Sequence, residues 1–155
     1  VLLIKQSADV GFLVLQRMVA SGRASSFSRR TLAGLSVSSI GIGCYRIGPS
    51  QRAALERGLQ DGMNLIDTSS VYLDGSSETT VGEVLKDNCI ISRSEVVVVT
   101  KVGYIQGAAL RKLKEASSHP WQDLVKFHPS AWHCIHPEFI RNEVKASAER
   151  LGTMP

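Results

Sequence analysis

Two short apolar runs in this chain each end at an ionisable side chain, and this spacing restricts the fold more than any other feature. Residues 63–66 are followed by Asp67, with Tyr72 five residues later, and the β-branched run 96–100 is followed by Lys101. Strands that are apolar on both faces are typical of parallel sheets covered by helices. In an α/β barrel the C-terminal strand ends form the catalytic face. The pattern therefore predicts that these three polar side chains meet at one end of a parallel sheet.

Strand and helix patterns alternate through the middle of the chain. A β-segment is expected at residues 31–45, and a helix at 51–60 follows with Ser50 as its N-cap. Ser77 is expected to cap a second helix, and residues 95–100 form the third strand. Alternation of this kind predicts an α/β fold with parallel strands. About three βα units of a (β/α)8 barrel are expected, since a whole barrel takes roughly 250 residues.

The last third of the chain is less regular. A basic helix is predicted at residues 108–116, but Pro120 and Pro129 favour a long folded loop over the rest of residues 102–136. Pro137 suits the first position of a helix, and the apolar spacing at 138–151 predicts an amphipathic helix.

Residues 1–30 differ in composition from residues 31–155, and this divides the chain into an N-terminal extension and a barrel segment. The extension carries five basic residues and one acid, whereas the rest balances thirteen of each, so the net charge of +4 belongs to the extension. Its sequence fits either an organellar transit peptide or a disordered leader, with Met18 as an alternative start. We expect it not to pack on the barrel segment. A cytoplasmic location is expected, or a mitochondrion or plastid if the extension is a transit peptide.

Composition excludes several kinds of partner. The barrel segment has no basic patch of the kind that binds nucleic acid, and no apolar run in the sequence is long enough to cross a membrane. Cys44, Cys89 and Cys134 are too few and too widely spaced for a disulfide framework, which favours a reducing compartment. The sequence does not indicate an oligomeric state.

Together, Asp67, Tyr72 and Lys101 fit one chemical task. A neighbouring ammonium stabilises a phenolate, and a carboxylate holds that ammonium charged and in place. A phenol in this setting can donate a proton to a carbonyl oxygen or take one from an alcohol. Because no side chain supplies hydride, a nicotinamide cofactor is implied.

These residues resemble the aldo-keto reductase family. The resemblance runs from about Thr31 to the end of the sequence. It rests on Asn64, Leu65, Ile66, Asp67, Thr68, Ser69, Tyr72, Asp74, Gly75, Ser77, Glu78, Val81 and Gly82, on Val99, Thr100 and Lys101, and on the helix 136–153.

The resemblance implies specific roles. Tyr72 would be the acid/base, Lys101 would tune it, and Asp67 would pair with Lys101. Gly43, Cys44 and Tyr45, together with Asp67, would lie against the nicotinamide end of the cofactor. NADP(H) is favoured over NAD(H), and the substrate would be a small carbonyl compound or alcohol.

The sequence also departs from the family. The resemblance implies a tetrad histidine after the fourth strand and a cofactor-phosphate site in the C-terminal half of the barrel, and neither can be placed in this chain. We therefore expect the 155 residues alone to be inactive and poorly stable, with wet apolar surface at Ile40, Ile42, Leu65, Val97 and Val99. The alternative is a truncated, non-catalytic relative that serves as an interaction module or is an incomplete gene product. The nucleotide sequence beyond Pro155 would distinguish these possibilities.

Two other motifs lead to weaker hypotheses. Gly41 and Gly43 are not followed by a third glycine at Rossmann spacing, which favours close packing at a strand end over dinucleotide binding. The histidines at 119, 128, 133 and 136 lie near Cys134, but their spacing matches no standard zinc module, so no metal site is predicted. None of the four can be assigned to the tetrad position.

Overall fold

A computed structural model describes residues 2–4, 28–32, 34–87, 91–118 and 120–153. The strands are β1 (Leu2–Ile4), β2 (Arg29–Leu32), β3 (Leu35–Ser38), β4 (Ile42–Gly43), β5 (Leu65–Asp67), β6 (Val97–Thr100), β7 (Tyr104–Ile105), β8 (Leu124–His128) and β9 (Ala131–Cys134). The α-helices are α1 (Arg52–Gln60), α2 (Ser76–Asp87), α3 (Gly107–Glu115) and α4 (Pro137–Arg150). In this part of the chain no helix combines the length and apolarity that a membrane crossing requires.

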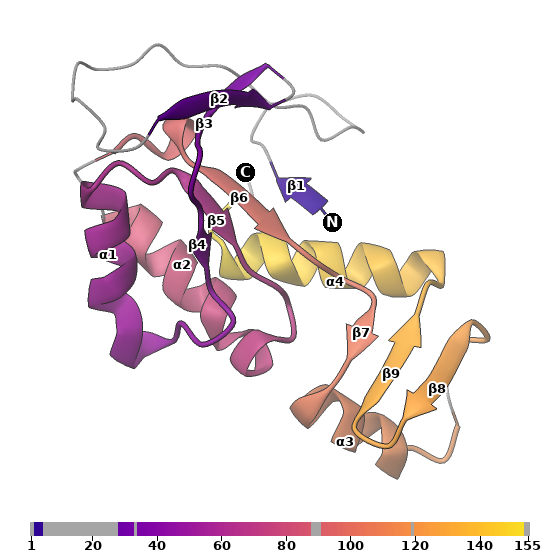
Figure 1. Cartoon of the computed structure of the whole chain (residues 1–155). Coiled ribbons are helices and arrows are strands. Elements are labelled where there is room, and N and C mark those ends of the chain that lie inside the picture. Colours follow the sequence, from indigo (N-terminus) through magenta and orange to yellow (C-terminus); the bar gives the residue numbers. More distant parts are fainter. Residues whose placement is uncertain (1, 5–27, 33, 88–90, 119, 154–155) are drawn as a thin grey trace.

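The predicted parallel strands form the centre of the fold. β4, β5 and β6 run parallel, with Ile42 opposite Ile66 and Leu65 opposite Val97. Helices α1 and α2 cover one face of this sheet, and the C-terminal end of α4 lies beside α2 (Figure 1). The main core fills this layer, with buried Cys44, Leu55, Leu59, Ile66, Val81, Val84, Leu85, Val96, Val98 and Leu151. The mixed α/β architecture is as predicted.

Several element ends differ from the predictions. β5 begins at Leu65 and β6 at Val97, each two residues later than expected. Ser50 lies inside a short 3-10 helix, Pro49–Gln51. It is not the N-cap of α1, which is Gln51. Ser77 is the second residue of α2 instead of its cap. Its buried hydroxyl donates to the Cys44 carbonyl oxygen at 2.9 Å, which ties the helix to the end of β4.

A β-hairpin covers the second face of the sheet. β2 pairs antiparallel with β3, and Leu35 and Val37 form a small cluster with Val97. Leu65 and Val99 pack against the same cluster. The prediction of wet apolar surface is therefore wrong for Val97, which is 7% exposed, because the hairpin supplies the missing opposite wall. Ile42, Leu65 and Val99 are half-buried, and the prediction is right for Ile40, which is 52% exposed.

Asn64 joins this hairpin to the sheet. Its buried amide accepts from the Ser38 backbone N–H at 2.7 Å, and it donates to the carbonyl oxygens of Ser36 at 2.9 Å and Glu95 at 2.7 Å. The hydrogen bond with Ser38 is buried, and those with Ser36 and Glu95 are partly buried. The side chain thus replaces ladder hydrogen bonds where three segments meet.

Replacing Asn64 with alanine is expected to lower the free energy of unfolding by about 1–3 kcal/mol, because buried backbone groups lose their partners. Urea denaturation measures the change. Asn142→Ala, at an exposed position on α4, is the control and should change stability by less than about 0.5 kcal/mol. Equal effects of the two substitutions would contradict the role given to Asn64.

The N-terminal extension also differs from the prediction. β1 pairs antiparallel with β6, with Leu2 opposite Thr100 and Ile4 opposite Val98. The expectation that residues 1–30 do not pack on the barrel segment is therefore wrong at β1, because an unpaired strand edge favours pairing with any extended segment. It is also wrong at Arg29 and Arg30, which pair with Ser38 and Val37 in the hairpin. Residues 5–27, which include Met18 and most of the proposed leader, lie outside the described residues.

The segment expected to be mainly a folded loop is a small α+β unit. α3 forms where a helix was predicted, but β7, β9 and β8 make an antiparallel sheet that was not predicted. This unit follows the end of β6 and lies against the N-terminal part of α4 (Figure 1). Its own core contains buried Ile105, Leu110, Trp132, Cys134 and Phe139. Helix α4 follows, with Pro137 at its first turn as predicted.

Candidate active site

The C-terminal ends of β5 and β6 place the predicted acid and lysine side by side. Asp67 is the last residue of β5 and pairs with Val99, two residues before Lys101. The chain then crosses in front of β6, where the Thr68 N–H donates to the Val99 carbonyl oxygen at 2.8 Å. The Ser70 N–H donates to the Lys101 carbonyl oxygen at 3.2 Å. These bonds fix the loop that carries Tyr72.

The Lys101 ammonium is the centre of the site. Its Nζ donates to Asp67 Oδ1 at 2.5 Å and to the Thr68 carbonyl oxygen at 2.8 Å. It also donates to Tyr72 Oη at 3.4 Å and lies 5.1 Å from the centroid of that ring. The structure thus brings together all three residues that the sequence singled out, at the end of the sheet where they were expected.

Electrostatics keep this lysine protonated. Partial burial lowers the pKa of Lys101, but the hydrogen bond and charge of Asp67, followed by the Tyr72 hydroxyl, raise it more, so the pKa lies above the ordinary lysine value. The side chains of Lys101 and Asp67 are 34% and 49% exposed, so solvent screens their attraction. Because its pKa lies far above neutral pH, Lys101 carries a full positive charge beside the Tyr72 phenol at neutral pH.

The end of β4 borders the same face. Gly43 lies opposite Asp67 in the sheet, and a Cβ added there would meet nothing within 4 Å. Tyr45 is 65% exposed, and its ring packs edge-on against Tyr72 at 5.2 Å between centroids. Open space therefore lies beside the Asp67 carboxylate, and the ring of Tyr45 borders this space.

Cys44 does not belong to this open face. Its side chain is fully buried in the main core, and its backbone N–H donates to the Asp67 carbonyl oxygen at 2.8 Å. Burial, followed by the charge of Asp67, raises the pKa of the Cys44 thiol to about 12. Cofactor contact by the segment 43–45 stays a prediction, in which the exposed Gly43 and Tyr45 face the open side and the side chain of Cys44 faces the core.

In the folded protein, Cys44 is expected to resist alkylation. A thiol with a pKa of about 12 has roughly one ten-thousandth of its population ionised at pH 8, against roughly a quarter for a free cysteine. Iodoacetamide should label Cys44 more than about a hundredfold faster in urea than in buffer, measured by peptide mass spectrometry. Equal rates would show that the thiol is accessible and ionised.

The turn after Tyr72 has an unusual backbone. Leu73 and Asp74 adopt left-handed φ angles of 51° and 54°, and Gly75 follows at 90°. Left-handed conformations cost of order 1–3 kcal/mol at residues other than glycine. The Asp74 carboxylate accepts a hydrogen bond from the Ala108 N–H at 3.1 Å. No separate role was predicted for Asp74 from the sequence.

An ion pair between α2 and α4, with a fully buried carboxylate, contacts the residue next to Lys101. This ion pair was not predicted from the sequence. Glu78 is 0% exposed, and it accepts from Thr100 Oγ1 at 2.5 Å and from Arg150 Nε at 2.7 Å. It therefore joins α2 and α4 to the residue just before Lys101. The sequence did contain a pattern that indicates burial of Glu78, because this residue lies at helical spacing from Val81 and Leu85, which are buried.

The described histidines have local structural contacts. His136 Nδ1 accepts from the Glu138 N–H at the start of α4. His133 packs edge-on against Tyr104, and His128 contacts Ser130. Among the residues that the structure describes, no three His, Cys, Asp or Glu side chains are grouped as metal ligands. His119 and Cys89 lie outside the described residues.

Comparisons with known proteins point to one family. Residues 39–155 match the aldo/keto reductase family. The NADH-specific methylglyoxal reductase of Escherichia coli is 32% identical over 132 residues, which are 76% of this chain and 36% of that protein. The structure of aldo-keto reductase AKR11C1 from Bacillus halodurans in its holo form is 26% identical with a TM-score of 0.61, covering 82% of this chain and 37% of that one. The glycerol dehydrogenase AKR11B4 of Gluconobacter oxydans is 25% identical with a TM-score of 0.50, covering 76% and 33%. The chain thus spans about a third of the length of these relatives.

Proposed function

Because the chain belongs to the aldo/keto reductase family, we propose that it supplies the proton-donating part of a nicotinamide-dependent carbonyl reductase. The observation that carries this proposal is the Lys101 ammonium, which lies within hydrogen-bonding distance of both the Asp67 carboxylate and the Tyr72 hydroxyl. We further propose that the three parallel strands and their helices are the first units of a partial (β/α)8 barrel, in which this strand end is the catalytic face.

The residues present fit the nicotinamide part of a cofactor. The space in front of Gly43 is open, and the exposed ring of Tyr45 and the carboxylate of Asp67 border it. We propose that Gly43, Tyr45 and Asp67 would hold a flat nicotinamide ring there. When bound, the cofactor supplies the hydride that carbonyl reduction requires. NADP(H) is the form favoured by the sequence, and NADH deserves an equal test because one relative is named as NADH-specific.

The three side chains would divide the proton chemistry between them. The Tyr72 hydroxyl would donate its proton to the carbonyl oxygen of the substrate. The Lys101 ammonium would stabilise the phenolate left behind, and Asp67 would keep that ammonium charged and oriented. In the reverse direction the phenolate would take the proton of an alcohol.

The proposed substrate is a small aldehyde or ketone. The Lys101 and Asp67 side chains are 34% and 49% exposed, so the proposed site is open to solvent. Methylglyoxal is a suitable probe, since two Escherichia coli relatives, 32% and 39% identical over their matched segments, are named as methylglyoxal reductases. A cytoplasmic location is part of the same proposal.

The test is an assay of cofactor consumption at 340 nm by the protein that carries this segment, with methylglyoxal and either NADH or NADPH. The proposal predicts consumption that depends on both substrate and protein. No consumption by that protein with either cofactor would favour the alternative, a non-catalytic relative that acts as an interaction module. Turnover by the 155 residues alone would show that the expectation of an inactive isolated chain is wrong.

A further inference from the structure

The turn that follows Tyr72 needs an external restraint. Leu73, Asp74 and Gly75 are consecutive left-handed residues, and the leucine side chain disfavours this conformation, which aspartate and glycine tolerate better. Such a backbone persists where surrounding structure fixes it, and it is concentrated at functional sites. Any relaxation of the turn would move the adjacent Tyr72.

Asp74 supplies that restraint through a helix that is distant in sequence. Its Oδ1 accepts from the Ala108 N–H at the start of α3, where Gln106, the residue at the N-cap, makes no side-chain capping bond. A carboxylate at this end of a helix is also favoured by the helix dipole. Asp74 thus performs for α3 the capping role that the local sequence leaves unfilled.

Gly107 is shaped to receive this carboxylate. Its φ is +55°, and a Cβ built on it would lie 1.8 Å from Asp74 Oδ1. A side chain at residue 107 is therefore incompatible with the observed position of Asp74. On the opposite side of the turn, Leu73 packs closely over Gly48, with 3.0 Å between Leu73 Cδ1 and a Cβ placed there.

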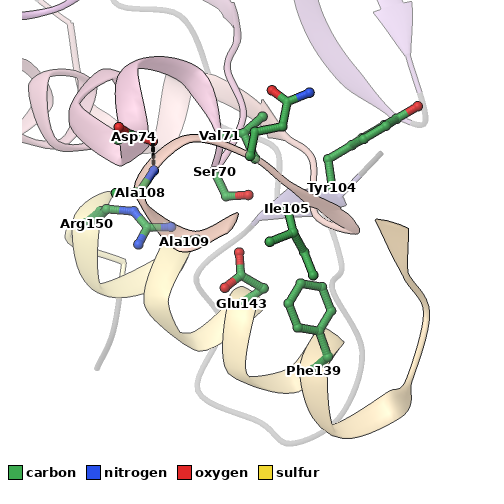
Figure 2. A pocket seen from close by; sticks show the side chains of 11 residues that line it. Ser70, Val71, Asp74, Tyr104, Ile105, Ala108, Ala109, Phe139, Glu143 and Arg150 are labelled. Carbon is green, nitrogen blue, oxygen red and sulfur yellow. Dashed lines mark hydrogen bonds between the residues drawn. The ribbon is translucent and has the colours of Figure 1, made fainter. Parts of the chain in front are cut away.

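A partly open pocket borders the turn. Its volume is about 150 Å³, and it lies between Ser70, Val71 and Asp74 on one side and Phe139, Glu143 and Arg150 of α4 on the other (Figure 2). Figure 2 shows the Asp74–Ala108 hydrogen bond at the edge of this pocket. On this side of the turn, the hydrogen bond therefore stands where a filled interior would supply packing.

We propose that Asp74 is a positioning residue for Tyr72: its carboxylate fastens the strained turn to α3 and so holds the phenol against Lys101. The Lys101–Tyr72 distance of 3.4 Å is at the long limit of a hydrogen bond, so a displacement of a few tenths of an ångström breaks it. The catalytic consequence of this inference rests on the proposed function, whereas its geometric part does not.

NMR spectroscopy of the folded chain tests the geometric part without turnover. Nuclear Overhauser effects from the Tyr72 ring to the Tyr45 ring and to the Lys101 side chain report the position of the phenol. Asp74→Ala should lose these effects and accelerate hydrogen exchange at the Ala108 amide. Asp74→Asn, which keeps an acceptor oxygen and tolerates left-handed φ, should retain them. Asp123→Ala, at an exposed aspartate outside this turn, is the matched control and should match the wild type.

A second variant covers the case in which Asp74→Ala does not fold. Gly107→Ala displaces the carboxylate sterically and should give the same loss at Tyr72. Retained Overhauser effects in either folded variant, or equal losses in Asp74→Asn and Asp74→Ala, would overturn the proposal.

Kinetics then separate the two claims. In the active protein, kcat of Asp74→Ala should fall by about 10- to 100-fold while KM changes little, as expected for a misplaced catalytic group. If the wild-type protein that carries this segment shows no turnover but the Overhauser effects depend on Asp74, the proposed function fails and the positioning role stands. If turnover is normal in Asp74→Ala, the positioning role fails and the proposed function stands.

Discussion

Replacing Tyr72 with phenylalanine is expected to lower kcat/KM for carbonyl reduction by about 10²–10⁴-fold, the usual contribution of a general acid. The ring should keep its edge-on packing against Tyr45, at 5.2 Å between centroids, so the fold should persist. The measurement is cofactor consumption with methylglyoxal in the protein that carries this segment.

Tyr104→Phe is the matched control for this substitution. Tyr104 is 48% exposed and packs edge-on against Phe127 and His133, and it is not one of the residues proposed to bind cofactor or transfer a proton. This control should retain turnover within about a few-fold of the wild type. Comparable losses in both variants would show that the effect does not depend on the Tyr72 hydroxyl.

Replacing Arg150 with leucine is expected to destabilise the fold by about 3–5 kcal/mol, because it leaves a buried charge without its partner. Glu78 is fully buried, and the Arg150 guanidinium approaches it within 2.7 Å. Thermal and urea denaturation would measure the loss. Arg141→Leu, at an exposed position on the same helix, is the control.

A double variant gives this prediction a second check. If Glu78 and Arg150 stabilise the fold as a pair, Glu78→Leu combined with Arg150→Leu should cost less than the sum of the single changes. Additive effects would show that the two side chains act independently, and the role given to the pair would be wrong.

The site could be predicted because its geometry follows from strand order. Parallel neighbouring strands bring their C-terminal ends to one edge, so Asp67 and Lys101 had to lie close together once both runs were taken as strands. Tyr72 follows within one short loop. The mixed α/β fold was predictable for the same reason, since it depends on local apolar runs and their alternation.

What the sequence did not predict depends on contacts between distant segments. β7 is two residues long, and β8 meets β9 through an irregular register between Val125 and His128, so neither shows a clear alternating pattern. The cap on α3 comes from Asp74, 34 residues away. Burial of Val97 depends on a hairpin more than 50 residues earlier in the chain. Local periodicity carries no information about such pairings.

The burial of Cys44 was not predicted, for a different reason. The resemblance marked Gly43, Cys44 and Tyr45 together as one segment beside the nicotinamide. In the structure, adjacent residues of this segment face opposite sides, and Cys44 is 0% exposed while Tyr45 is 65% exposed. A motif identifies a segment, but the pleat of the strand decides which of its side chains can reach a ligand.

Deuterium transfer tests the central claim most directly. The protein that carries this segment is incubated with methylglyoxal and NADH or NADPH carrying deuterium at both C4 positions of the nicotinamide, and the alcohol product is analysed by mass spectrometry. The account predicts one deuterium on the former carbonyl carbon, with the yield falling by about 10²–10⁴-fold in Tyr72→Phe. Unlabelled alcohol, no alcohol from the wild type, or equal yields from the two proteins would contradict it.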